Sequence, residues 1–192
     1  TSARESIRKL VKESIRNLTR KADFPVGFPQ IAPDDLGLLL FTSASDGSPK
    51  GVMLTHANLV SNVSALLDLR NPPIVSAEDT VLAVLPLFHV YGLNTVLTMA
   101  IAAGASVVIL DRFDAVDSLN VISREHVTTV AGAPAMYLMW SRVPFVATAM
   151  RPIRLLSSGG APLPVEVFNR FEELTGMRIF EGYGMTETSP VI

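Results

Sequence analysis

Short apolar runs alternate with helical patterns along most of the chain. The runs are largely uninterrupted and often bounded by Gly or Pro, as expected for strands that are buried on both faces. They cover residues 36–42, 80–85, 106–110, 127–130, 153–157 and 177–180. Because helical patterns lie between several of these runs, the sequence predicts an α/β fold with a mostly parallel sheet flanked by helices.

Three of the predicted helices have recognisable ends. Thr55 and Asp114 each precede a helical pattern and are suitable N-caps, since their side-chain oxygens can accept hydrogen bonds from free backbone amides. Pro164 fits the first turn of another helix, which is predicted to end at Gly176.

The first 33 residues have a different pattern. Residues 3–20 place apolar side chains at helical spacing with basic side chains on the other side, which predicts an amphipathic helix. A stretch with several Pro and Gly residues, 24–33, predicts a linker. The basic face is expected to lie in solvent, although it also suits peripheral contact with a membrane or a partner. We therefore divide the chain into a helix and linker, 1–33, and an α/β domain, 34–192.

Composition limits the class of protein. The chain has 192 residues, of which 48% are hydrophobic, so it can bury a large core. A net charge of -2 gives no general attraction to nucleic acid, and the absence of cysteine excludes thiolate sites. No apolar run reaches the ~18 residues that span a bilayer, and the charged first turns do not form a signal peptide. We expect a cytoplasmic protein and, because the chain begins without Met, a fragment.

Two polar segments, 42–51 and 181–187, carry candidate chemistry. The first combines hydroxyls, two glycines and a lysine, which suits a phosphate-binding loop, although such segments are also ordinary exposed turns. Its spacing is too short for a Walker phosphate loop. The second offers an aromatic ring, a hydroxyl and a carboxylate for a nucleobase, a phosphoryl oxygen and a metal ion. Ligands of parallel sheets bind beyond the carboxyl ends of the strands, so segments 43–51, 86–92, 157–162 and 181–187 are expected to meet at one edge.

Four ordered motifs resemble one family. Residues 42–51 read T-S-A-S-D-G-S-P-K-G and resemble the family loop T-S-G-T-T-G-x-P-K-G, and residues 182–187 match its signature G-Y-G-M-T-E. Residues 86–92, P-L-F-H-V-Y-G, and 158–163, S-G-G-A-P-L, match two further segments. Residues 34–192 therefore resemble part of the large N-terminal domain of adenylate-forming, AMP-binding enzymes of the acyl-CoA synthetase type.

The resemblance implies a reaction and a set of ligands. An ATP-dependent enzyme of this type activates a carboxylic acid, here expected to be a fatty or aryl acid, to an acyl-adenylate and transfers it to coenzyme A. The β- and γ-phosphates are implied to bind Thr42, Ser43, Ser45, Ser48 and Lys50. Thr186 is implied to bind the α-phosphate and Glu187 to bind Mg²⁺, a cation that prefers oxygen ligands. Lys50 and Glu187 are thus expected to border one cavity.

Further residues are implied to surround the adenine and the acid. Tyr183, between Gly182 and Gly184, is implied to stack on adenine. The adenine and acyl side is implied to be lined by Gly159, Gly160, Ala161 and Pro162, although these glycines also suit simple turns. His89 is implied to orient the carboxylate, the alternative being a packed core histidine.

The first motif departs from the family at three adjacent positions, Ala44, Ser45 and Asp46. Like charges at ~4 Å repel by about 4 kcal/mol at an effective dielectric of ~20, so Asp46 is expected to weaken ATP binding. The family's ribose-binding aspartate and C-terminal lid would follow Ile192, so this chain alone is expected to be inactive. Two alternatives remain open: an adenylation domain that loads a carrier protein, and a non-catalytic relative that binds an acyl ligand or a partner.

Overall fold

The computed structural model describes residues 30–43, 49–69 and 72–192. The chain divides into two units, Thr1–Ala32 and Pro33–Ile192. The predicted amphipathic helix and most of the predicted linker lie outside the described residues. Within the described part, no helix has the length and apolar content needed to cross a membrane.

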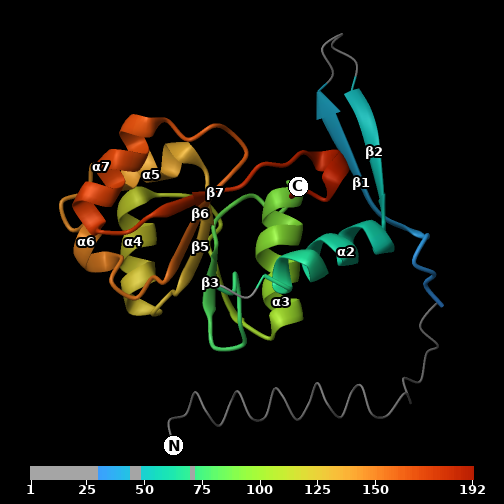
Figure 1. The fold of residues 1–192 in the computed structure, drawn as a ribbon, viewed down its shortest axis with the longest axis horizontal. Coiled ribbons are helices and arrows are strands. Elements are labelled where there is room, and N and C mark those ends of the chain that lie inside the picture. Colours follow the sequence, from blue (N-terminus) through green and yellow to red (C-terminus); the bar gives the residue numbers. More distant parts are fainter. Residues whose placement is uncertain (1–29, 44–48, 70–71) are drawn as a thin grey trace, which may run out of the picture. The chain divides into compact units, whose positions relative to one another are not determined.

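A parallel sheet forms the centre of the second unit (Figure 1). Its strands are β3 (Thr80–Ala83), β4 (Ser106–Ile109), β5 (Thr129–Gly132), β6 (Leu155–Ser158) and β7 (Ile179–Glu181). The spatial order is β4-β3-β5-β6-β7, and every neighbouring pair is parallel. The predicted α/β class is confirmed. The carboxyl ends of all five strands consequently face one edge of the sheet.

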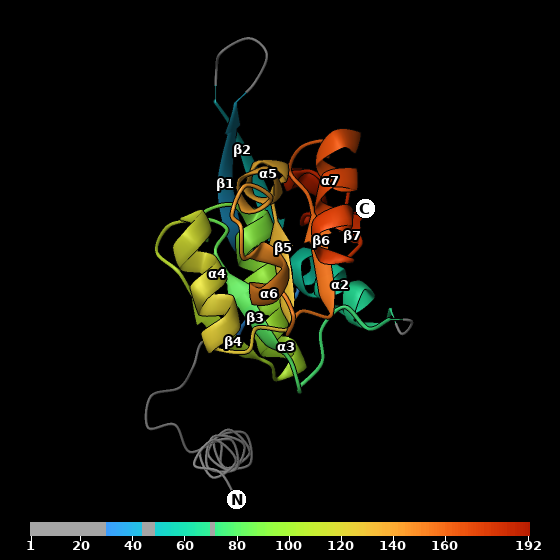
Figure 2. The ribbon, with the colours of Figure 1, turned by 90° about the vertical axis from the view of Figure 1, so that its left-hand side faces the viewer.

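Helices cover both faces of this sheet. One layer contains α4 (Ala115–Arg124), α5 (Pro134–Trp140), α6 (Val146–Ala149) and α7 (Val165–Thr175), and it faces the viewer in Figure 2. Its core includes Trp140, Tyr137 and Phe171, whose rings pack edge to face. The other layer contains α2 (His56–Leu67), the π-helical segment η1 (Tyr91–Thr98) and α3 (Met99–Ala103). Each layer buries its apolar side chains against its own face of the sheet.

The predicted helix ends are confirmed. Thr55 Oγ1 accepts a hydrogen bond from the Asn58 amide at 3.2 Å, and Asp114 Oδ1 accepts from two first-turn amides of α4, each at 2.9 Å. Pro164 is the N-cap of α7, and Gly176 ends that helix with φ 70°, in the left-handed region that glycine adopts readily.

The apolar run 36–42 was wrongly assigned to the buried parallel strands. It forms β1 (Leu36–Ser43), which pairs only with the antiparallel β2 (Pro49–Thr55) in a separate hairpin. One face of the hairpin packs inward through Leu54, while Phe41 and Met53 on the other face are both 71% exposed. Residues 49–51, which were included in a polar loop, are part of β2. The residues of β1 suit a strand, whereas Pro49, Lys50 and Gly51 of β2 are types that strands disfavour, and the sequence does not show that the two segments pair.

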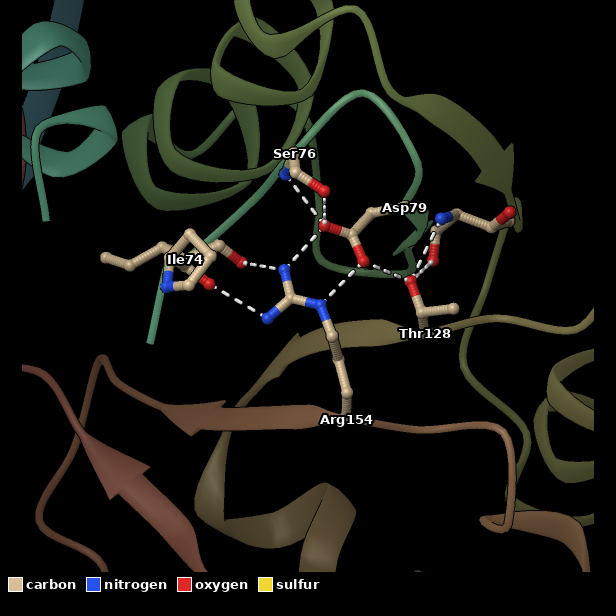
Figure 3. A network of polar contacts seen from close by, with 7 residues as sticks. Ile74, Ser76, Asp79, Thr128 and Arg154 are labelled. Carbon is tan, nitrogen blue, oxygen red and sulfur yellow. Dashed lines mark hydrogen bonds and ion pairs between the residues drawn. The ribbon is translucent and has the colours of Figure 1, made fainter. Parts of the chain in front are cut away.

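The amino ends of the central strands are joined by one polar network (Figure 3). Asp79, which precedes β3, accepts hydrogen bonds from Arg154 Nε at 2.7 Å and Nη2 at 2.5 Å, and from Thr128 Oγ1 at 2.7 Å. Burial raises the pKa of Asp79, but the bonds from Arg154, Thr128 and Ser76 outweigh it and hold that pKa well below its usual range. Because Arg154 precedes β6 and Thr128 precedes β5, a single carboxylate fixes three strand starts.

Candidate functional site

A cavity of about 290 Å³ lies at the carboxyl edge of the sheet. It is lined by Thr42, His89, Tyr91, Gly159 and Gly160, and by residues 182–187, Pro190 and Val191. These residues follow β3, β6 and β7 or end β1. The prediction that four segments meet at one edge is therefore confirmed for 86–92, 157–162 and 181–187. Of the fourth segment, 43–51, the described residues 49–51 do not line the cavity. Among the predicted adenine and acyl residues, Gly159 and Gly160 reach the cavity, whereas the exposed Ala161 and Pro162 do not line it.

The residues after β7 form a compact turn, residues 182–192, which we call the motif loop. Thr186–Thr188 form a short 3₁₀ turn within it, with Thr186 half-buried and Glu187 exposed. The loop closes through the amide of Met185, which donates to the Pro190 carbonyl at 3.0 Å, and that of Ile192, which donates to the Tyr183 carbonyl at 3.0 Å. A Cβ on Gly184 would lie 2.1 Å from the Pro190 oxygen, so only glycine permits this closure.

The β1–β2 hairpin contributes the other side of the cavity. Thr42 lines the cavity and is paired directly with Lys50 across the hairpin. Directly paired residues project on the same face, so Lys50 projects on the cavity side although it is not part of the lining. β2 also contacts the 3₁₀ turn that carries Glu187. Ser45 and Ser48 lie outside the described residues, as does the side chain of Ser43.

His89 is exposed at the cavity wall, so the interpretation of a packed core histidine is wrong. Its Nδ1 accepts a hydrogen bond from the Tyr91 amide at 3.2 Å. The neutral ring therefore carries its proton on Nε2, which remains a donor for an oxygen ligand. Gly92 permits the tight turn, because a Cβ there would lie 2.4 Å from the Pro86 oxygen.

Tyr91 is a site residue that the sequence reasoning missed. It lines the first cavity and also a second, more apolar cavity of about 430 Å³. Burial raises the pKa of the Tyr91 phenol, and a hydrogen bond with Ser157 offsets part of this effect, so the ring stays neutral at pH 7. The motif P-L-F-H-V-Y-G contained the only sequence signal for it.

The second cavity adjoins the first. The two share Tyr91, Gly182, Tyr183 and Val191, and the second extends to Leu66 and Ile74. Thr95 lines it, and the buried hydroxyl of this residue has no hydrogen-bond partner within the described part of the chain. This combination of apolar walls and a few polar groups is typical of small-molecule sites.

Residues 4–192 match the family model of the AMP-binding enzymes. The chain belongs to this family.

Named relatives of this AMP-binding chain include two CoA ligases. The chain is 42% identical over 165 residues to 4-coumarate–CoA ligase 2 of Oryza sativa subsp. japonica, an overlap of 84% of this chain and 29% of that protein. It is 38% identical over 169 residues to the long-chain-fatty-acid–CoA ligase of Bacillus subtilis (strain 168), an overlap of 85% and 29%. The chain thus spans about 30% of the length of these relatives.

Solved structures of AMP-binding enzymes have the same fold. A malonyl-CoA ligase with methylmalonyl-CoA and AMP bound superposes with a TM-score of 0.78 at 34% identity, covering 86% of this chain and 36% of that one. ATP-bound MatB from Rhodopseudomonas palustris gives a TM-score of 0.77 at 32% identity, covering 85% and 32%.

The donor set at the first cavity suits magnesium bound to a phosphate ligand. No group of three or more His, Asp or Glu residues able to hold a metal occurs in residues 30–43, 49–69 and 72–192. Mg²⁺ usually binds one or two carboxylates together with substrate phosphates and water. The exposed Glu187 carboxylate at the cavity wall fits that requirement, whereas it would not hold a metal alone.

Proposed function

We propose that the protein carrying this chain uses ATP to convert a carboxylic acid into an acyl-adenylate and then transfers the acyl group to coenzyme A. One observation carries the proposal: Thr42, His89, Thr186 and Glu187, which are far apart in the sequence, line a single cavity. Family membership and the CoA-ligase relatives support it.

The first half-reaction brings an anionic carboxylate to the α-phosphorus of ATP and releases pyrophosphate. The developing charge needs donors that are already in place. In the proposed site the Thr186 hydroxyl donates to the α-phosphate, and Thr42, Ser43, Ser45, Ser48 and Lys50 hold the phosphates that leave. Glu187 would hold Mg²⁺, which supplies charge neutralisation at the phosphates. The exposed Tyr183 ring stacks on adenine beside Gly159 and Gly160.

The acid is proposed to lie across both cavities. Its carboxylate occupies the first cavity, where His89 Nε2 can donate to one oxygen, and its apolar part occupies the second cavity beyond Tyr91. A volume of about 430 Å³ bordered by Leu66, Ile74 and Leu155 suits an aryl or fatty acid.

Pyrophosphate exchange into ATP tests the proposal directly. The intact protein, assayed with Mg²⁺ and a panel of fatty and aromatic acids, is expected to catalyse exchange with at least one acid. Glu187→Gln should reduce that exchange at least about 100-fold, since one electrostatic contact to the transition state is removed. Thioester formation on adding coenzyme A then tests the second half-reaction. Exchange with none of the acids would contradict the proposal and favour a binding protein instead.

A further inference from the structure

The motif loop is held in place by two asparagines from another layer of the molecule, the half-buried Asn62 and the buried Asn94. Asn62 in α2 donates through Nδ2 to the carbonyl of Val191 at 2.7 Å and to that of Thr188 at 3.4 Å. Asn94 in η1 donates through Nδ2 to the carbonyl of Ser189 at 2.7 Å. Three carbonyl groups of the loop, those of Thr188, Ser189 and Val191, are thus attached to α2 and η1 through side chains that lie 95 to 129 positions earlier in the sequence.

Asn94 has the more central position of the two. It is 1% exposed, and its second Nδ2 hydrogen donates to the carbonyl of Leu59 in α2 at 3.1 Å. A primary amide has two N–H donors, so a single side chain can join α2, η1 and the motif loop. The Asn94 carbonyl already accepts a hydrogen bond from the Met99 amide, so the bonds to α2 and the motif loop come from the Asn94 side chain.

The loop requires such donors because its backbone is buried at this point. Ser189 is 3% exposed and has φ 69°, a left-handed conformation that is uncommon for serine. A buried carbonyl without a partner costs free energy, and a strained residue persists only where its surroundings hold it. The two amides therefore stabilise the conformation that presents Thr186 and Glu187, which immediately precede the attached residues.

We propose that Asn62 and Asn94 are positioning residues for adenylation, an inference that rests on the proposed function. Neither side chain lines the first cavity. They act through the loop, by fixing the distance of Thr186 and Glu187 from Thr42 and His89 on the other walls. Displacement of catalytic groups by about 1 Å can lower a rate about 100-fold, so loss of the anchors lowers the rate of the chemical step.

The kinetic test compares Asn62→Ala and Asn94→Ala in the intact protein with a matched control. Ser118→Ala is the control, because it deletes a different buried hydrogen bond, from Trp140 Nε1 at 2.8 Å, in the other helix layer. We expect each asparagine variant to lower kcat for pyrophosphate exchange at least about tenfold, with the KM for the acid changed less than about twofold. Asn94→Gln, which keeps an amide donor, should recover part of kcat. Ser118→Ala should retain kcat per folded molecule, and an equal loss there would overturn the inference.

Hydrogen exchange separates this inference from the proposed function, because it needs no turnover. In the asparagine variants, the amides of Met185, Ser189 and Ile192 should exchange at least about tenfold faster while those of α4 remain protected. Ser118→Ala should show the reverse. If the protection of the motif-loop amides is unchanged in the asparagine variants, the anchoring is overturned even where the protein catalyses pyrophosphate exchange. If the wild type catalyses no pyrophosphate exchange, the proposed function fails. The hydrogen-exchange protection of the loop amides still tests the anchoring. If Asn94→Ala does not fold, Asn62→Ala gives the same two measurements at a half-buried position.

Discussion

Two of the described residues that carry a buried polar atom without a partner lie at or next to the cavities. In the described part of the chain, four buried atoms have no hydrogen-bond partner: Asn62 Oδ1, Thr95 Oγ1, Thr129 Oγ1 and Ser158 Oγ. Thr95 lines the second cavity, Ser158 directly precedes Gly159, and Asn62 anchors the motif loop. Since buried polar groups are normally paired, the unpaired hydroxyls of Thr95 and Ser158 cost stability in a region next to the cavities.

The first prediction concerns Asp46, which lies outside the described residues between β1 and β2. Its charge is expected to oppose the ATP phosphates in the proposed site. Asp46→Thr and the isosteric Asp46→Asn should each tighten Mg·ATP binding at least about threefold, which is the part of the repulsion that survives salt screening. Calorimetry on the intact protein gives the affinity. Glu172→Gln on the exposed surface of α7 removes the same charge elsewhere, and it should have no effect.

An unchanged affinity in both Asp46 variants would show that this carboxylate points away from the nucleotide. A gain with Glu172→Gln of the same size would indicate a general effect of net charge instead. Either result removes the reason for expecting weak ATP binding from the departures at Ala44, Ser45 and Asp46.

At the scale of elements, patterns that depend on neighbours in sequence predicted well. The central strands β3, β5 and β6 appeared as apolar runs because they are largely buried on both faces, and the edge strands β4 and β7 because they bury at least part of their side chains. The caps at Thr55 and Asp114 are local chemistry. The hairpin partner β2 was missed because Pro49, Lys50 and Gly51 read as a loop, and only its pairing with β1 makes it a strand. The π-helical geometry of η1 has no comparable local signature.

The same distinction applies to the site. Thr42, His89, Gly159, Gly160 and residues 182–187 were predicted from contiguous motifs, and the structure gathers them at one cavity. The second cavity was not predicted, because Leu66, Ile74, Thr95 and Leu155 come from separate elements and share no spacing. Likewise, no pattern connects Asn94 with Ser189, which are 95 positions apart.

The prediction at this scale concerns Asp79, which joins the starts of β3, β5 and β6, and the effect of pH on its contribution to stability. The pKa of Asp79 lies below its unfolded value, so its contribution to stability is complete above about pH 5 and is lost as pH falls further toward the folded pKa. Asp79→Asn should cost about 2–3 kcal/mol of unfolding free energy at pH 7, because Arg154 loses its charged partner. The difference between wild type and variant should shrink as pH falls from about 4.5 to 3.

Urea unfolding of the chain at several pH values measures this difference. Glu173→Gln, an exposed acid on α7, is the control and should follow the wild type. A difference that stays constant down to pH 3 would mean that the ion pair with Arg154 does not titrate in this range. A difference that grows with acidity would reverse the predicted sign.

At the scale of the molecule, the first cavity is bordered by three parts that belong to different structural elements. The hairpin forms its own two-stranded sheet, η1 belongs to one helix layer, and the motif loop follows the edge strand β7. All three supply lining residues through Thr42, Tyr91 and Glu187. A ligand that contacts these three residues would therefore link the hairpin to the main sheet, and its binding energy would add to the stability of the whole arrangement.

The last prediction follows from that linkage. Mg·ATP at about 100 times its Kd should stabilise the intact protein by about 2.7 kcal/mol, which corresponds to a rise in Tm of about 2–5 °C if the unfolding unit is larger than this chain. EDTA should remove most of the rise in Tm. The variant Glu187→Gln should lose the magnesium-dependent part of this rise. Its Tm without ligand should equal that of the wild type, because the exposed Glu187 side chain contributes little to folding. Thermal unfolding with ATP alone, with Mg²⁺ alone and with both together separates the contributions of the nucleotide and of magnesium to the rise in Tm. If the hairpin amides gain no hydrogen-exchange protection when Tm rises, the nucleotide binds without bridging to Thr42 and Lys50, and the shared cavity is not a single functional site.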